Sequence, residues 1–71
     1  MTKLERLAEI EGFDGTLELL EESVADSVCP GICRRKGCDY ATGVEPDQSN
    51  GWCEERRAGT VASALVLAGL I

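Results

Sequence analysis

The sequence predicts one small α+β domain with two N-terminal helices, a cysteine-bearing β-hairpin and a short apolar C-terminal helix. Its 71 residues suffice for a single domain with a marginal hydrophobic core. Residues 1–28 hold eight acidic and two basic side chains, and they therefore carry the whole net charge of −6. Residues 29–58 hold all four cysteines, and residues 59–71 hold no charge. We therefore expect three segments within a single domain that spans residues 1–71.

The acidic N-terminal segment predicts two helices. Thr2 and Glu5 have the spacing of a capping box that starts the first helix, and Gly12 ends it. Asp14 or Thr16 can cap the second helix. The first helix is expected to bury Leu4, Leu7, Ala8 and Ile10. The second is expected to bury a stripe formed by Leu17, Leu20, Val24 and Val28.

The central segment is rich in turn-forming residues and predicts one short hairpin. Pro30 and Gly31 end the second helix, so that Cys29 is expected at its C-terminus. Residues 38–44 and 51–53 are the only plausible strands of this segment, joined by residues 45–50. The turn dipeptide Asn50-Gly51 supports a connection between them.

The C-terminal segment predicts a helix that begins after Thr60 as N-cap and covers residues 61–71. A strand is the alternative, but alanine and leucine outnumber the β-branched residues. The segment is apolar all round, so we expect most of it to be buried. A chain this small has little mass to cover such a helix. The sequence therefore indicates a homodimer through the C-terminal tail, or a protein partner at that tail.

Composition excludes several classes of protein. The chain has no histidine, which excludes a histidine-based catalytic triad and a mixed Cys/His zinc finger. A net charge of −6 disfavours nucleic acid as a partner. The longest uncharged run, residues 58–71, is shorter than the about 20 residues that cross a bilayer, so no membrane association is expected. The N-terminal residues show no apolar signal-peptide core, so we expect a cytoplasmic location.

The four cysteines predict a structural zinc site with Cys29, Cys33, Cys38 and Cys53 as ligands. Four thiols within 25 residues of a cytoplasmic chain indicate a metal before disulfides. Gly37 lets the chain turn before Cys38, so that Cys33 and Cys38 can share an ion. Free buried thiols, disulfides and an iron–sulfur cluster are the alternatives.

Charged and aromatic residues surround the cysteines. The basic residues would offset the charge of a thiolate site, and they are Arg34, Arg35, Lys36, Arg56 and Arg57. A nucleic-acid patch is the alternative for the run Arg34-Arg35-Lys36. Tyr40 and Trp52 are expected to cover the metal core, with stacking on a nucleobase as the alternative. Glu54 and Glu55 are expected to be solvated neighbours of the arginines rather than general bases.

Several stretches resemble a family of small, uncharacterised bacterial and phage-borne proteins with a zinc-ribbon-like centre. The likeness covers nearly the whole chain, and its most specific pieces are Val44-Glu45-Pro46-Asp47-Gln48 and Gly51-Trp52-Cys53-Glu54. The weaker pieces are Asp26-Ser27-Val28, Pro30-Gly31-Ile32-Cys33, Gly37-Cys38-Asp39-Tyr40, Thr60-Val61, Ser63 and Leu65-Val66-Leu67-Ala68-Gly69.

The resemblance implies the metal pattern C-x4-C followed by C-x2-C. Cys33, Cys38 and Cys53 match its first three positions, and Arg56 stands at the fourth, where it cannot bind zinc. Either Cys29, which the family pattern does not include, replaces the missing ligand, or the site is lost and the fold survives without it. The resemblance implies a zinc-binding module and supplies no activity.

Two functions from different classes are consistent with these features. The first is a non-catalytic, zinc-stapled protein-interaction module. The alternative is an acidic inhibitor or nucleic-acid mimic of the kind phages use against nucleases or CRISPR complexes, with its acidic helices in a basic groove of a host protein. Redox exchange between Cys29 and Cys33 is weakly supported, because the gap is three residues and no βαβ unit surrounds it.

Overall fold

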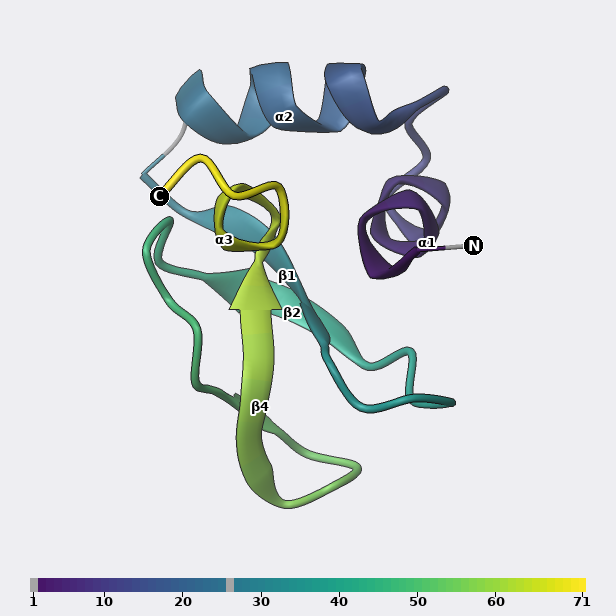
Figure 1. The fold of residues 1–71 in the computed structure, drawn as a ribbon, viewed down its shortest axis with the longest axis vertical. Coiled ribbons are helices and arrows are strands. Elements are labelled where there is room, and N and C mark those ends of the chain that lie inside the picture. The colour runs from purple at the N-terminus through teal and green to yellow at the C-terminus, as the bar shows by residue number, and fades with distance from the viewer. Residues whose placement is uncertain (1, 26) are drawn as a thin grey trace.

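The chain forms three helices and a four-stranded antiparallel sheet in a computed structural model that describes residues 2–25 and 27–71. The helices gather at one end of the molecule and the sheet extends away from them (Figure 1). The predicted α+β class is therefore confirmed. The elements are α1 (Lys3–Ile10), α2 (Thr16–Ala25), β1 (Cys29–Cys33), β2 (Ala41–Val44), β3 (Gly51–Cys53), β4 (Ala58–Ser63) and α3 (Ala64–Leu67).

The sheet has the strand order β2-β1-β4-β3. β1 lies in its centre and pairs with β2 through Ile32 and Ala41, and with β4 through Cys33 and Val61. Gly31 allows this close pairing, because a Cβ atom there would lie 2.7 Å from a methyl carbon of Val44. Any larger side chain at position 31 would therefore push β1 away from its neighbours.

The predicted hairpin is only partly correct. β3 has the expected bounds and β2 is a shortened form of the expected strand, but the two do not pair with each other. β1 and β4 lie between them; β1 was not expected, and a strand was only the alternative for the segment that holds the second half of β4. The prediction placed Cys29 at the end of the second helix, whereas Cys29 begins β1. Residues 29–33 are almost fully buried, so β1 lacks the alternation that marks a half-exposed strand.

The helix starts were better predicted than the buried faces. Thr2 accepts a hydrogen bond from the Glu5 N–H at 3.1 Å, and the Glu5 carboxylate accepts one from the Thr2 N–H at 2.8 Å, so the capping box is confirmed. In α2, however, Leu19 and Ser23 are buried. Leu17 and Val24 are 72% and 65% exposed, whereas Leu20 is partly buried against the core, so the predicted stripe is wrong except at Leu20.

The buried serine explains this error. The Ser23 hydroxyl donates to the Leu19 carbonyl oxygen at 2.7 Å, so its polar group is satisfied within the helix and can face the core. Val28, which the prediction also placed in the stripe, lies beyond the end of α2 and is 61% exposed. A count of apolar residues alone therefore selected the wrong side of the helix.

The C-terminal segment divides between a strand and a short helix. β4 runs to Ser63, whose hydroxyl caps α3 by accepting from the Val66 N–H at 3.1 Å. The predicted cap at Thr60 is therefore wrong, because Thr60 lies within β4. Burial is confirmed for residues 61–65, but Leu70 and Ile71 are more than 60% exposed. Among the described residues, no helix has both the length and the apolar character needed to cross a membrane.

The described side chains form two buried clusters on different parts of the sheet. The helical core joins the helices to β1 and consists of Leu7, Ala8, Leu19, Cys29, Ile32, Ala64 and Leu65. The thiol cluster consists of Cys33, Cys38, Cys53 and Val61, with Tyr40 and Val44 packed against it. The turns that follow β1 and β3 lie at the end of the molecule away from α2 (Figure 1). The protein thus has a hydrocarbon centre and a separate sulfur centre.

Candidate metal centre

Three thiols from separate segments meet in the thiol cluster. The sulfur atoms of Cys33, Cys38 and Cys53 all lie within 4.8 Å of one another. Cys33 ends β1, Cys38 follows the next turn, and Cys53 ends β3. The Cys38 and Cys53 sulfur atoms are 3.8 Å apart, nearly twice the length of a disulfide bond, and all three thiols are free. The arrangement is that of a site for a thiophilic metal ion.

The turn after β1 brings Cys38 back to Cys33. The Cys38 N–H donates to the Arg35 carbonyl oxygen at 3.1 Å, and Gly37 takes a left-handed conformation with φ of 82°. The Cys33 N–H donates to the Tyr40 carbonyl oxygen at 2.8 Å and closes the loop. Glycine suits position 37 because other residues adopt a positive φ at a steric cost. This loop is the one predicted from the sequence.

A second tight turn wraps around Cys53. The Arg57 N–H donates to the Cys53 carbonyl oxygen at 2.7 Å, and the Arg56 N–H donates to the Cys53 sulfur atom at 3.3 Å. Arg57 has φ of 53°, an uncommon conformation for a residue with a side chain. These two hydrogen bonds fix the position of the Cys53 sulfur atom relative to the turn. The turn therefore holds Cys53 beside the other thiols.

Hydrogen bonds and burial shift the thiol pKa values in opposite directions. Burial raises the pKa of Cys33, but hydrogen bonds from the Thr60 hydroxyl, the Arg35 backbone and the two neighbouring thiols outweigh it and lower the pKa to about 7. The Tyr40 backbone lowers the pKa of Cys38, but burial and the neighbouring thiols together raise it above its usual value. The thiolate therefore forms more readily at Cys33 than at Cys38, and thiolate is the form that binds a metal.

Cys29 does not join the other three cysteines. It is fully buried in the helical core, where its sulfur atom donates to the Pro30 carbonyl oxygen at 3.4 Å. Cys29 and Cys33 are the two ends of β1, and four residues of strand span about 13 Å. The structure therefore groups three of the four predicted ligands and places Cys29 elsewhere, because the segment is a strand and not a helix end.

Arg56, which stands at the fourth position of the family pattern, makes a hydrogen bond to the backbone of the turn after β1. The Arg56 guanidinium donates to the Lys36 carbonyl oxygen at 3.4 Å and so links the two turns. The Glu55 carboxylate contacts one of the thiols, because its Oε2 atom lies 3.7 Å from the Cys38 sulfur atom. The sequence prediction treated Glu55 as a solvated neighbour of the arginines. The sequence did contain a signal for Glu55, because a carboxylate is a common zinc ligand and this one stands two residues after Cys53.

The two aromatic residues near the cysteines have different environments. Tyr40 is half-buried and packs against the thiol cluster, as predicted. Trp52 is 55% exposed, while Gly51 and Cys53 on either side of it are buried. Successive residues of a strand face opposite sides, so the burial of Cys53 directs Trp52 outward. The prediction that Trp52 covers the cysteines is therefore wrong.

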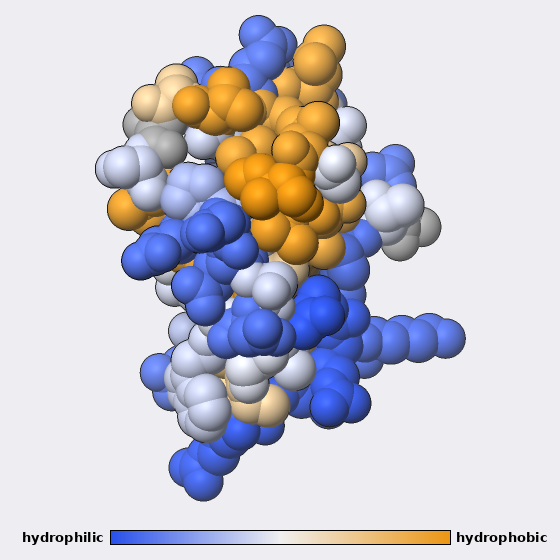
Figure 2. Space-filling model, turned by 60° about the vertical axis from the view of Figure 1, so that its left-hand side comes forward, coloured by the Kyte–Doolittle hydropathy of each residue, from blue (hydrophilic) through white to orange (hydrophobic). Residues whose placement is uncertain are grey.

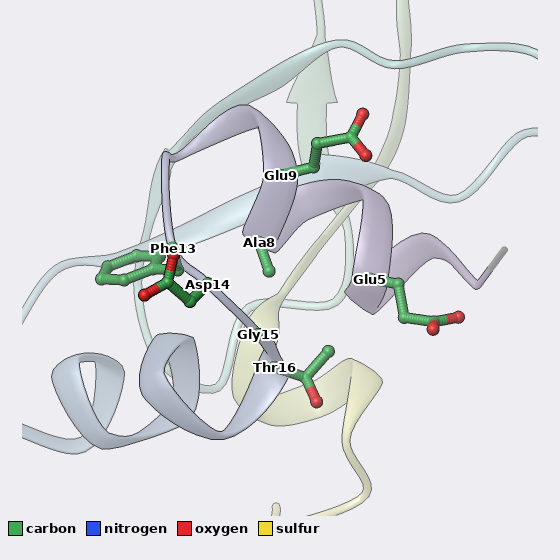
Figure 3. A pocket seen from close by; sticks show the side chains of 7 residues that line it. All are labelled: Glu5, Ala8, Glu9, Phe13, Asp14, Gly15 and Thr16. Carbon is green, nitrogen blue, oxygen red and sulfur yellow. The ribbon is translucent and has the colours of Figure 1, made fainter.

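Surface hollows lie apart from the thiol cluster, and two of them are lined by charged residues. One, of about 390 Å³, lies between α1 and the start of α2 and is lined by Glu5, Glu9 and Asp14. Their carboxylates point in different directions and do not converge on a point (Figure 3). The other, of about 430 Å³, is lined by four basic residues and Asp39: Lys3, Arg6, Arg34 and Lys36. Asp39 pairs with two of them, Lys3 and Arg6, which reduces the positive charge there.

No protein-family model, curated protein or solved structure gives a significant match to this chain. The resemblance to a phage-borne zinc-ribbon-like family therefore stays a prediction. The thiol cluster and the exposed surface of the protein are the features that bear on its function.

Proposed function

We propose that this protein is a small, non-catalytic, zinc-stapled module that binds another protein. The observation that carries the proposal is the meeting of Cys33, Cys38 and Cys53 in one buried cluster. Zinc suits thiolate ligands and undergoes no redox change. A bound ion would connect the end of β1, the turn after it and the end of β3. The sheet would then hold its shape with little hydrophobic burial at this end.

A structural role fits the burial of the cluster better than a catalytic one. Cys33 and Cys53 are fully buried and Cys38 is 2% exposed, so a substrate has little access to the sulfur atoms. The chain also has no histidine to act as a general base. These features support a site that stabilises the fold.

The surface opposite the thiol cluster supports an interaction role. Hydrophobic residues gather at the end of the molecule that carries α2 and the C-terminus (Figure 2). We define the apolar face as Leu17 and Val24 of α2 with Leu70 and Ile71 of the tail, each more than 60% exposed. Leu17 and Val24 are seven residues apart and therefore share one side of α2. Large exposed apolar side chains at one end of a small protein are typical of a docking surface.

Charge favours a partner of a particular kind. Glu18, Glu21 and Glu22 of α2 are also exposed, and Glu21 lies between Leu17 and Val24 on the same side of the helix, so this surface carries negative charge. A second copy of the chain would bring its own acidic helices against them, at a cost in repulsion. We therefore propose a protein partner with an apolar groove and basic residues at its edge, rather than a homodimer.

The alternative function, an acidic inhibitor or nucleic-acid mimic, rests on the same glutamates. In that case charge rather than apolar contact would supply the affinity, and binding would collapse as salt rises. Apolar contact persists at high salt. Salt dependence therefore separates the two functions.

Native mass spectrometry of protein purified without chelator tests the staple. We expect one zinc ion per chain with four reduced cysteines. A mass with four reduced cysteines and no ion would refute the zinc site. The same spectrum reports the number of chains in the particle, and a stable dimer would refute the proposed preference for a different partner.

A synthetic amphipathic helix with leucines on one side and lysines on the other serves as a probe of the apolar face. We expect it to bind the wild-type protein at low and high salt, and to bind the double variant Leu17→Ser/Val24→Ser at least about tenfold more weakly. Trp52→Ser is the matched control, because it removes an exposed apolar side chain of β3, outside the apolar face. Equal binding by all three proteins would refute this docking surface.

A further inference from the structure

The thiol cluster supplies three ligands, and structural zinc sites almost always have four. Cys29 belongs to the helical core, and Arg56 carries a cationic group that repels a metal ion. A fourth ligand must therefore come from another residue or from water. Among the described residues, Glu55 is the acidic residue whose side chain contacts a thiol of the cluster.

Two distances agree with a tetrahedral zinc site that includes Glu55. Zinc–sulfur bonds of about 2.3 Å at tetrahedral angles place two sulfur ligands about 3.8 Å apart. The Cys38 and Cys53 sulfur atoms are 3.8 Å apart. With a zinc–oxygen bond of about 2.0 Å, a sulfur and an oxygen ligand would be about 3.5 Å apart. The Cys38 sulfur atom and Oε2 of Glu55 are separated by 3.7 Å.

The turn after β3 explains why this side chain reaches the cluster. The Arg56 and Arg57 N–H groups both donate to Cys53, to its sulfur and carbonyl oxygen atoms respectively. The backbone therefore bends around Cys53, and this bend places the Glu55 carboxylate next to Cys38. The Glu55 side chain is otherwise exposed and contacts only Cys38 among the three thiols, so its carboxylate must rotate toward Cys33 and Cys53 to contact a shared ion.

From this geometry we propose that Glu55 is the fourth zinc ligand, in a site formed by Cys33, Cys38, Cys53 and the Glu55 carboxylate. The inference rests on the proposed zinc staple and specifies its ligand set. Three thiolates, one carboxylate and Zn²⁺ have a formal charge of −2. Basic residues of both turns lie near enough in sequence to offset it, including Arg56, which bridges the turns.

The neighbouring glutamate provides a matched control. Glu54 is exposed, has the same charge and lies in the same turn. Glu54→Gln and Glu55→Gln remove the same charge from adjacent positions, so general electrostatics would affect both variants equally. A ligand role would affect Glu55→Gln alone.

Zinc affinity, measured by competition with a chromophoric chelator, is the first readout. We expect Glu55→Gln to bind zinc at least about tenfold more weakly than wild type, and Glu54→Gln to match wild type. The second readout is the visible spectrum of the Co²⁺ form. The thiolate charge-transfer bands should persist in Glu55→Gln, because three cysteines remain, while the d–d bands should shift as the oxygen ligand changes.

The outcomes distinguish this inference from the staple itself. If wild type binds zinc and both glutamine variants behave like it, or weaken equally, then Glu55 is not a ligand and the three-thiol site stands. If wild-type protein binds no zinc, the staple fails and the ligand assignment fails with it. Cys38→Ser serves as the reference for a site that has lost a ligand.

Discussion

The helical core and the thiol cluster are both buried, but their chemistry differs. The helical core buries large hydrocarbon side chains from helices and sheet, among them Leu7, Leu19 and Ile32. The thiol cluster buries three cysteines and one valine, Val61. Cysteine side chains bury little area, so hydrophobic transfer stabilises the second region much less. The comparison indicates that a chain of this size can build one hydrocarbon centre and needs a covalent or metal link for another.

Metal removal is expected to have the largest effect on this comparison. Zinc binding contributes about 10–16 kcal/mol in small zinc-dependent domains, more than a short chain obtains from packing. We expect chelation to remove hydrogen-exchange protection first from the N–H groups of Cys33, Cys38 and Arg57. The amides of α1 and α2 should keep more of their protection. Equal loss of hydrogen-exchange protection in both regions, or no loss in either, would show that zinc does not stabilise the thiol cluster more than the helical core.

Leu19→Ala tests the helical core and should have the second largest effect. Leu19 is fully buried, so the truncation should lower the free energy of unfolding by about 2–5 kcal/mol. Leu17→Ala is the control on the same helix, and a change within about 0.5 kcal/mol is expected because Leu17 is exposed. Denaturant unfolding of the zinc-bound proteins measures both. The reverse order would mean that the predicted stripe of α2 was correct after all.

Cys29→Ala should have the smallest effect and sharpens the boundary between the regions. It removes one buried sulfur atom from the helical core, at a cost of about 1 kcal/mol. Zinc content should stay at the wild-type level, whereas Cys38→Ala should lose the ion. Metal analysis of the purified variants measures this. Loss of zinc from Cys29→Ala would restore the ligand set expected from the sequence.

Local signals explain why part of the fold was predictable. The capping box of Thr2 and Glu5 needs only residues three apart, and the loop from Cys33 to Cys38 needs only Gly37 between them. The start of β3 likewise follows the turn dipeptide Asn50-Gly51. Each of these signals needs only residues close in sequence.

The positions of Cys29 and Glu55 depended on contacts that sequence spacing does not report. Cys29 and Cys33 look equivalent as thiols four residues apart. Once β1 forms, they occupy its two ends and belong to different clusters. Glu55 and Glu54 look equivalent as neighbouring acids, and only the turn around Cys53 brings one of them to Cys38.

The amino-acid sequence by itself determined the α+β class, the starts of the first helix and of β3, and the grouping of Cys33 with Cys38. Only the tertiary structure decided the strand order, the buried side of α2 and the separation of Cys29 from the other three thiols. The physical reason is the range of the interactions involved. Caps and turns are satisfied within a few residues, whereas burial and strand pairing depend on which distant segments compete for the same small interior.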